Sequence, residues 1–449
     1  MSHNPVDSRM TRRRWLAEGC AVWTGLLSQW ALGGTAPLKP GAKAKSVILI
    51  FNPGAPSHLD LWDPKPLASD NVRGPFRAIE TNVPGIRVSE LLPDLAQRMN
   101  QLAVLRTVGH SHSAHNAGMY WSIVGRPYRI DNTLINPSRA DFPCLGTLVG
   151  WLAQRDGYSG AMAPYVITPR PHSDGPYVTP GQFGSCLGAR FDPFVLNTDP
   201  NVSNFQLPDM EQVAGVSKIR LASRLELLKG VDRTRGIGVS DSFHEWDEQR
   251  DRAVSAMQSD QARRAFDLSA ESPATRERYG RTSWGQSHLL ARRLVEAGVR
   301  FVTTVNGPGI TWDTHKDNFN LLKNKLVPPM QQAFAALLDD LSERGLLDTT
   351  LVIWMSDFGR TPRINKDAGR DHWPQCYSMV LAGGGIRGGQ VVGESDKSGA
   401  FPRTRPISPA DVHATVYTAL GYDPLRVTYK TLDGRPVALS QGKPIGELL

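Results

Sequence analysis

Four short runs of apolar, mostly β-branched residues constrain the fold of this chain more than any other feature. They lie at residues 46–54, 102–108, 299–305 and 349–355, and Asn-Pro-Gly ends the first of them. Segments with a helical pattern lie between the runs, and the order strand–helix–strand is typical of a parallel sheet covered by helices. We therefore expect an α/β fold with a doubly wound, mostly parallel sheet sandwiched between helices.

The start of the chain has the character of a targeting segment rather than of a folded domain. Thr11-Arg12-Arg13-Arg14-Trp15-Leu16 resembles the twin-arginine export motif, and a weakly apolar stretch follows it. We predict that residues 1–33 are a twin-arginine-type signal peptide and that the protein is periplasmic or secreted. The alternative is a basic amphipathic start without a role in export.

The remainder is expected to form one domain at residues 44–449. Its segment at about 151–260 is rich in glycine and proline and is predicted to be a loop-rich insertion rather than a separate domain. The body of the chain contains no apolar run of membrane-spanning length, so we expect no transmembrane anchor.

Charge and cysteine content exclude several classes of function. The net charge of +8 is spread over the chain without a dense basic run, so a nucleic-acid partner is not expected. The four cysteines have no paired spacing, which argues against a zinc knuckle.

Aspartate or histidine follows each of the four predicted strands. Because ligands of an open α/β sheet bind at the carboxyl ends of its strands, these side chains are candidates for one shared site. Carboxylate oxygen and imidazole nitrogen together are typical ligands of zinc, manganese or iron. The predicted metal ligands are Asp60, Asp313, His315, Asp357 and His372.

Each of these residues also has a structural interpretation. Asp313 could cap a helix, Asp60 could pair with Lys65, and Asp357 could pair with Arg360. His372 could be a loop histidine without a ligand role.

Several motifs together resemble a known family. They include GAPSHLDLWDPKP from residue 54, WDTH from 312, SDFGRTPRIN from 356 and GRDHWP from 369. The chain is similar to the secreted bacterial family called domain of unknown function 1501, a branch of the alkaline-phosphatase/sulfatase superfamily. The resemblance implies that superfamily's fold and one or two divalent metal ions, for which zinc, manganese and calcium are candidates. It also implies a secreted cytochrome-like protein as a partner.

The resemblance is partial at the centre of the site. Asp357 takes a metal-ligand position, but Phe358 stands where the superfamily usually has a ligand histidine. His115 stands at the position of the nucleophile, so a formylglycine precursor is not expected. Ser111 or Ser113 could replace the nucleophile, and His115 could attack phosphorus or bind a metal.

We expect an exported, metal-dependent hydrolase of phosphate or sulfate esters. Its substrate would be an anionic ester, either a small molecule or a polysaccharide, and Arg360 or Arg370 would offset negative charge in the transition state. The alternative is a binding or scaffold protein that keeps the fold and has lost turnover. Convergence of the named aspartate and histidine side chains would favour the enzyme.

Overall fold

The computed structural model describes residues 43–205, 227 and 259–449. The predicted signal peptide at 1–33 lies outside these residues, as does most of the predicted insertion beyond residue 205. Within the described part, no helix is both long and apolar enough to span a membrane.

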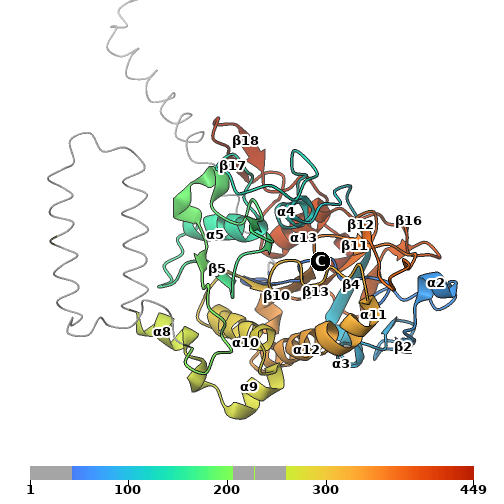
Figure 1. The fold of residues 1–449 in the computed structure, drawn as a ribbon. Helices are drawn as coiled ribbons and strands as arrows, with labels where there is room; N and C mark the ends of the chain where they lie inside the picture. The colour runs from blue at the N-terminus through green and yellow to red at the C-terminus, as the bar shows by residue number, and fades with distance from the viewer. Residues whose placement is uncertain (1–42, 206–226, 228–258) are drawn as a thin grey trace, which may run out of the picture.

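A central eight-stranded sheet organises the domain (Figure 1). Its strands follow the spatial order β14-β4-β13-β10-β1-β9-β5-β8, and within this sheet only β13 runs antiparallel to its neighbours. The strands are β1 (Ser46–Phe51), β4 (Leu102–Val108), β5 (Tyr165–Thr168), β8 (Phe194–Val195), β9 (Phe301–Val305), β10 (Thr350–Met355), β13 (Tyr377–Gly383) and β14 (Gln390–Val392). The expected mostly parallel α/β sheet is confirmed.

Helices cover both faces of this sheet (Figure 1). The strands alternate their side chains between the two faces, so Leu49 of β1 joins one hydrophobic core and Ile50 joins the other. One face carries α4 (His115–Val124), α5 (Leu145–Arg155) and α13 (Pro409–Ala419), and the other carries α3 (Pro93–Ala96), α10 (Ser283–Glu296) and α12 (Val327–Glu343). Apolar residues on both faces explain why the strand sequences are continuously hydrophobic.

Shorter elements decorate this frame. The remaining α-helices of the described residues are α2 (Asp70–Arg73), α8 (Asp260–Phe266), α9 (Pro273–Tyr279) and α11 (Asn318–Leu321). Two-stranded ribbons pair β2 (Ala78–Glu80) with β3 (Arg87–Ser89), β6 (Ser173–Asp174) with β7 (Tyr177–Val178), β11 (Gly359–Arg360) with β12 (His372–Trp373), β15 (Glu394–Ser395) with β16 (Pro402–Thr404), and β17 (Thr428–Lys430) with β18 (Pro436–Ala438).

The described part of the predicted insertion is continuous with the central sheet. Its strand β5 pairs in parallel with β9, and β8 pairs in parallel with β5. This segment therefore extends one edge of the sheet, although its glycine- and proline-rich sequence suggested loops alone.

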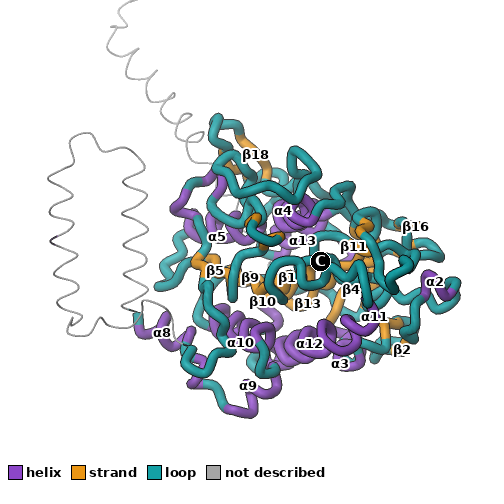
Figure 2. Tube along the Cα trace, in the orientation of Figure 1, coloured by secondary structure: helices purple, strands orange, loops and turns teal. Residues whose placement is uncertain are grey.

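The connection between β10 and β13 folds back on itself. Most of it is loop in the tube view (Figure 2), but β11 pairs with β12 so that Arg360 lies opposite His372. This pairing returns the chain to the carboxyl end of β10, where the segments that follow β4 and β9 also lie.

Candidate metal centre

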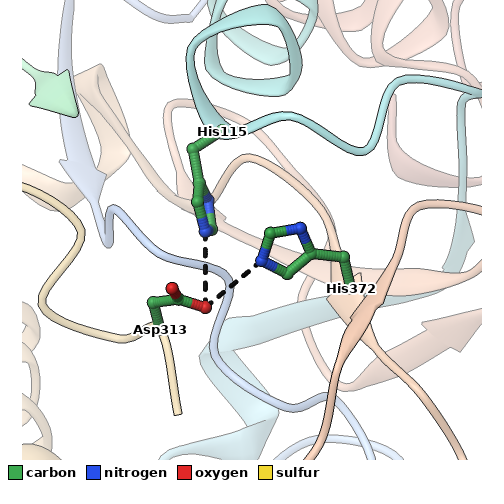
Figure 3. A group of neighbouring side chains, drawn as sticks. All are labelled: His115, Asp313 and His372. Atoms are coloured by element: carbon green, nitrogen blue, oxygen red, sulfur yellow. Dashed lines mark hydrogen bonds and ion pairs between the residues drawn. The ribbon is translucent and has the colours of Figure 1, made fainter. Parts of the chain in front are cut away.

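Three side chains from separate connections converge at this edge of the sheet (Figure 3). His115 is the first residue of α4, Asp313 follows β9, and His372 lies in β12. One ligand atom from each lies within 4.8 Å of the other two, so the three residues could together hold a metal ion. Of the predicted residues, the structure thus brings together His115, Asp313 and His372.

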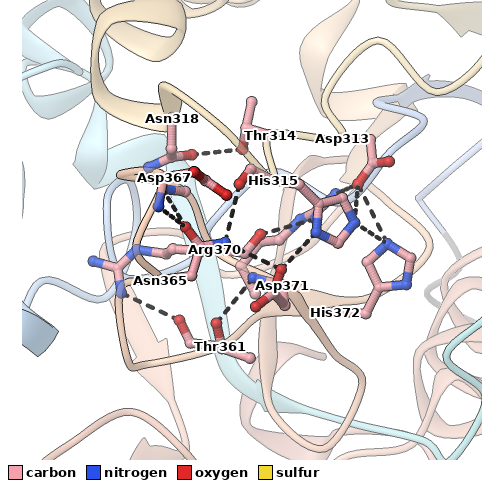
Figure 4. Close-up of polar contacts among 12 residues, drawn as sticks. Asp313, Thr314, His315, Asn318, Thr361, Asn365, Asp367, Arg370, Asp371 and His372 are labelled. Carbon is pink, nitrogen blue, oxygen red and sulfur yellow. Dashed lines mark hydrogen bonds and ion pairs between the residues drawn. The ribbon is translucent and has the colours of Figure 1, made fainter.

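His315 adds a third imidazole nitrogen to this group (Figure 4). Its Nε2 lies 3.1 Å from Asp313 Oδ1 and 3.0 Å from His372 Nε2. The Nε2 atoms of His115 and His372 each lie 3.3 Å from the same Asp313 oxygen. Three imidazole Nε2 atoms therefore face one carboxylate oxygen.

The opposite nitrogen of each ring is held by an oxygen atom. His115 Nδ1 lies 2.5 Å from Asp357 Oδ2, and His315 Nδ1 lies 2.6 Å from Asp371 Oδ1. His372 Nδ1 lies 2.6 Å from the carbonyl oxygen of Ser113. A carboxylate or carbonyl oxygen only accepts, so each Nδ1 donates its proton.

This hydrogen bonding determines the tautomer of each ring, and therefore whether its Nε2 carries a proton or a lone pair. A neutral imidazole has one N–H, so a ring that donates from Nδ1 carries a lone pair at Nε2. Three such lone pairs and the Asp313 oxygen are stable together only if positive charge lies among them, supplied by a cation or by extra ring protons. His115 Nε2 is buried without a hydrogen-bond partner, as expected for a ligand atom whose ion must complete the contact.

The electrostatic environment agrees with this description. Burial disfavours the charged ring of His115, but the Asp357 and Asp313 carboxylates outweigh burial and raise its pKa to about 9. Burial also disfavours the Asp313 carboxylate, yet its contacts with His115, His372 and Arg360 hold its pKa well below the usual range. The site is therefore built to keep Asp313 ionised and to stabilise positive charge beside it.

Outer residues orient this group. Carboxylates behind ligating histidines fix the tautomer and the orientation of the ring. Asp357 has this position behind His115, so the structure places it next to the three-residue group and not among it. The predicted ligand set leaves out Asp371, which has the same position behind His315 and also accepts from Asn365 Nδ2 at 3.2 Å.

Asp371 offers a direct test of this arrangement. We expect Asp371→Asn to weaken divalent-metal affinity by about 10- to 100-fold, because an amide fixes the His315 tautomer less well than a carboxylate does. Competition with a chromophoric chelator measures the change. An unchanged affinity would show that His315 does not depend on Asp371.

Arg360 is fully buried beside the group. Its guanidinium donates to Asp313 Oδ1 at 2.5 Å, to Ala55 O at 2.8 Å, and to the carbonyl oxygens of Gly54 and Arg370. These bonds engage the side chain in holding Asp313, whereas its predicted role was to offset negative charge on a substrate.

Asp60 lies outside the group (Figure 4 shows its partners Arg370 and Asn318). Its oxygens accept from Arg370 Nε at 2.8 Å and Nη2 at 3.0 Å, and from Asn318 Nδ2 at 2.9 Å. Asp60 and Arg370 are both fully buried, so their salt bridge ties the loop after β1 to the loop after β10.

The two candidate serines differ in their surroundings. Ser111 is exposed on the loop before α4. Ser113 Oγ donates to Asp131 Oδ2 at 3.0 Å, while the carbonyl of Ser113 accepts from His372. Asp131 also accepts from the backbone N–H groups of Ser113 and Ala114.

Phe358 closes one side of the group. Its ring is fully buried and stacks on His115, with ring centroids 4.9 Å apart. Phe358 occupies the position at which the resemblance would have placed a further ligand histidine. Its ring instead packs against the ligand candidate His115.

The fold and this edge define an α/β domain with a histidine- and aspartate-rich centre at the carboxyl ends of its parallel strands. The model of the family described as "Protein of unknown function (DUF1501)" matches residues 44–449. The chain belongs to this family.

The chain is similar in fold to several solved structures. A protein in the alkaline phosphatase superfamily from Vibrio parahaemolyticus matches with 11% identity and a TM-score of 0.40, over 90% of this chain and 72% of that one. The sulfatase PsFucS1 from Pseudoalteromonas sp. matches with 13% identity and a TM-score of 0.35, over 95% and 77% of the chains. The phosphonate monoester hydrolase SpPMH from Silicibacter pomeroyi matches with 12% identity and a TM-score of 0.36, over 90% and 76%. At these identities the likeness concerns the fold alone, and a search of curated proteins found no match.

Proposed function

We propose that this protein is a metal-dependent hydrolase of phosphate or sulfate esters. The observation that carries the proposal is the convergence of three imidazole Nε2 atoms on Asp313 Oδ1, with every Nδ1 held by an oxygen acceptor. Imidazole-rich sites favour zinc or iron over calcium, which prefers oxygen ligands.

His115, Asp313, His315 and His372 would hold the ion. When bound, a divalent cation supplies Lewis-acid activation of the ester and offsets negative charge in the transition state. Arg360 keeps Asp313 in place through a buried charge-assisted hydrogen bond.

Ser113 is the better supported nucleophile among the predicted candidates. Its hydroxyl lies within hydrogen-bond reach of a carboxylate, Asp131, that could accept its proton, and its carbonyl fixes the ligand candidate His372. His115 Nδ1 donates to Asp357 and its Nε2 would bind the ion, which leaves this ring without a nitrogen for attack on phosphorus.

The substrate in this proposal is an anionic ester, because a cation at the sheet edge attracts negative charge. Export by the twin-arginine route belongs to the same proposal and is supported by the sequence from Thr11 to Leu16. The resemblance to a secreted family supports a cytochrome-like partner in the same compartment.

Metal analysis of the folded protein tests the proposal. We expect stoichiometric divalent metal in the wild type, loss of the metal in His372→Ala, and weaker retention in Asp357→Ala. Asp348→Asn is the matched control, since Asp348 is exposed before β10, at the opposite end of that strand. Circular dichroism confirms folding, and the metal-loaded protein is then assayed with 4-nitrophenyl phosphate and 4-nitrophenyl sulfate. Absence of metal after reconstitution with zinc, manganese, iron and calcium would refute the proposal.

The packing of Phe358 on His115 favours a second candidate function, a binding protein without turnover. A protein of this kind would retain the cation and bind anionic esters without cleaving them. Calorimetry with phosphate and sulfate esters, beside the hydrolysis assay, separates the two functions.

A further inference from the structure

Backbone hydrogen bonds join the loop between β11 and β12 to the segment that follows β9 (Figure 4). The N–H of Asp317 donates to Asp367 O at 3.0 Å. The N–H of Arg370 donates to Thr314 O at 3.2 Å. All ligand candidates except His115 lie in these two segments or directly beside them, so these bonds hold most of the candidate centre together as one unit.

Gly369 allows the two segments to approach so closely. A Cβ atom at this position would overlap His315 O and would lie 2.6 Å from Lys316 N. Both of these are backbone atoms, so no side-chain rotation could relieve the overlap. The backbone of His315 therefore packs directly against the backbone of the loop that carries Asp371.

The side-chain amide of Asn365 lies within this contact (Figure 4). Its Oδ1 accepts from the backbone N–H groups of Asp367 at 3.0 Å and Gly369 at 2.9 Å. Its Nδ2 donates to His315 O at 3.0 Å and to Asp371 Oδ1 at 3.2 Å. This orientation pairs every donor with an acceptor, whereas a reversed amide would place its NH2 group against two N–H groups.

The two bonds from Asn365 Nδ2 restrain both the backbone and the ring of His315. One bond reaches the backbone carbonyl of His315. The other reaches the Asp371 oxygen that accepts from His315 Nδ1 at 2.6 Å. The Asp371 side chain is 52% exposed, so water competes for its oxygens. The second donor, Asn365, therefore keeps this carboxylate turned toward the ring.

We propose that Asn365 is a positioning residue of the candidate metal centre, which aims the Nε2 atom of His315 at the ion by holding both its backbone carbonyl and its carboxylate partner. The inference rests on the proposed function, because it assigns a role at the same centre. Asn365 acts through His315 and Asp371 and is not itself a ligand.

The variant Asn365→Ser separates this role from the fold of the loop. A serine hydroxyl can still accept from the backbone N–H two residues further on, as the asparagine does, although more weakly. It lacks the amide group that donates to His315 and Asp371. We expect zinc affinity to fall by about 10-fold, the lower end of the range for a residue outside the ligands, measured by competition with a chromophoric chelator.

Asn320→Ser is the matched control. Asn320 also donates from Nδ2 to a carboxylate, Asp317 Oδ1, at 2.6 Å, but this carboxylate does not hold a ligand candidate. Its replacement should leave zinc affinity unchanged, and circular dichroism verifies that each variant folds. If the wild type binds zinc and Asn365→Ser binds it equally well, this inference fails and the hydrolase proposal stands. If the wild type binds no metal, both fail.

A double-mutant cycle tests whether Asn365 acts through Asp371. In that case Asn365→Ser should cost clearly less zinc affinity in the Asp371→Ala background than in the wild type, because the carboxylate that it holds is already gone. A cost that is the same in both backgrounds would overturn the inference.

A measurement on the metal-free protein distinguishes positioning from a general loss of structure. Nitrogen-15 NMR shows which ring nitrogen of a neutral histidine carries the proton. At a pH at which the ring is neutral, we expect His315 of the wild type to carry its proton on Nδ1, and we expect Asn365→Ser to contain both tautomers. A His315 ring that keeps its proton wholly on Nδ1 in Asn365→Ser would overturn the inference.

Discussion

The Asp313→Asn variant is expected to lose at least about 100-fold in divalent-metal affinity and to lose ester hydrolysis. Three imidazole nitrogens face Asp313 Oδ1, and the substitution replaces a charged ligand by a neutral one of the same size. This loss should exceed the loss caused by replacing a residue that only hydrogen-bonds to a ligand, which typically lowers metal affinity by about 10- to 100-fold. Zinc competition titration measures the affinity, and circular dichroism verifies that the variant folds.

The control for this prediction is Asp367→Asn. Asp367 is an exposed carboxylate of the loop between β11 and β12 (Figure 4), and it lies outside the group of residues that could hold an ion. Its replacement should leave metal affinity unchanged. If Asp313→Asn and Asp367→Asn retain zinc equally well, Asp313 is not a ligand.

The second large effect concerns stability. Asp340 of α12 is buried and accepts from Arg292 Nε at 2.8 Å, from Tyr279 Oη at 2.8 Å and from Arg344 Nε at 2.7 Å. Removing Asp340 leaves the buried Tyr279 hydroxyl without its acceptor and takes away one of three carboxylates around Arg292, which still pairs with Glu271 and Glu296. We expect Asp340→Ala to lower the free energy of unfolding by about 3 kcal/mol, measured by chemical denaturation.

A surface pair provides the matched control. Glu394 and Arg403 form an ion pair with both side chains more than half exposed, so Glu394→Ala should cost no more than about 1 kcal/mol. Similar losses in Asp340→Ala and Glu394→Ala would show that burial adds nothing to the Asp340 network.

The pH dependence of stability follows from the same residue. Burial disfavours the Asp340 carboxylate, but the hydrogen bond from Arg344 and the charge of Arg292 outweigh it and lower the pKa. The pKa of Asp340 is thus lower in the folded state than in the unfolded state. The contribution of Asp340 is full above the unfolded value of about 3.9 and is lost as the pH falls through the folded pKa. The free energies of unfolding of the wild type and of Asp340→Ala, measured as a function of pH, should therefore converge as the pH falls through this acidic range.

The class of fold could be predicted because its signals are local. Continuous apolar runs gave the strands near their observed bounds, for example 102–108, which is β4. Local signals predicted the wrong secondary structure where tertiary contacts determine the backbone conformation. The sequence VSELLPDLAQRMN at residues 88–100 predicts a helix capped by Ser89, but Ser89 ends β3 and only Pro93–Ala96 is α-helical there. The backbone N–H of Ser89 bonds to Leu61 O, a partner that no local pattern reveals.

The candidate site could be predicted only to the level of the sheet edge. The position after a strand says where a residue lies along the chain, but not which atom it turns toward which neighbour. Asp60 follows β1 as expected, yet its carboxylate pairs with Arg370, far away in sequence. The orienting roles of Asp357 and Asp371 depend on ring tautomers, and these follow from hydrogen bonds formed only in the folded chain.

The reversed direction of β13 has a consequence for how this domain can be altered. Because β13 runs antiparallel to β10, the loop that carries His372 leaves and re-enters the sheet at one edge, between two adjacent strands. The length and sequence of such a loop can change without a new crossover helix or a new strand order. Transplanting residues 356–376 between members of the family would therefore exchange ligand and outer residues as one unit while the scaffold stays the same.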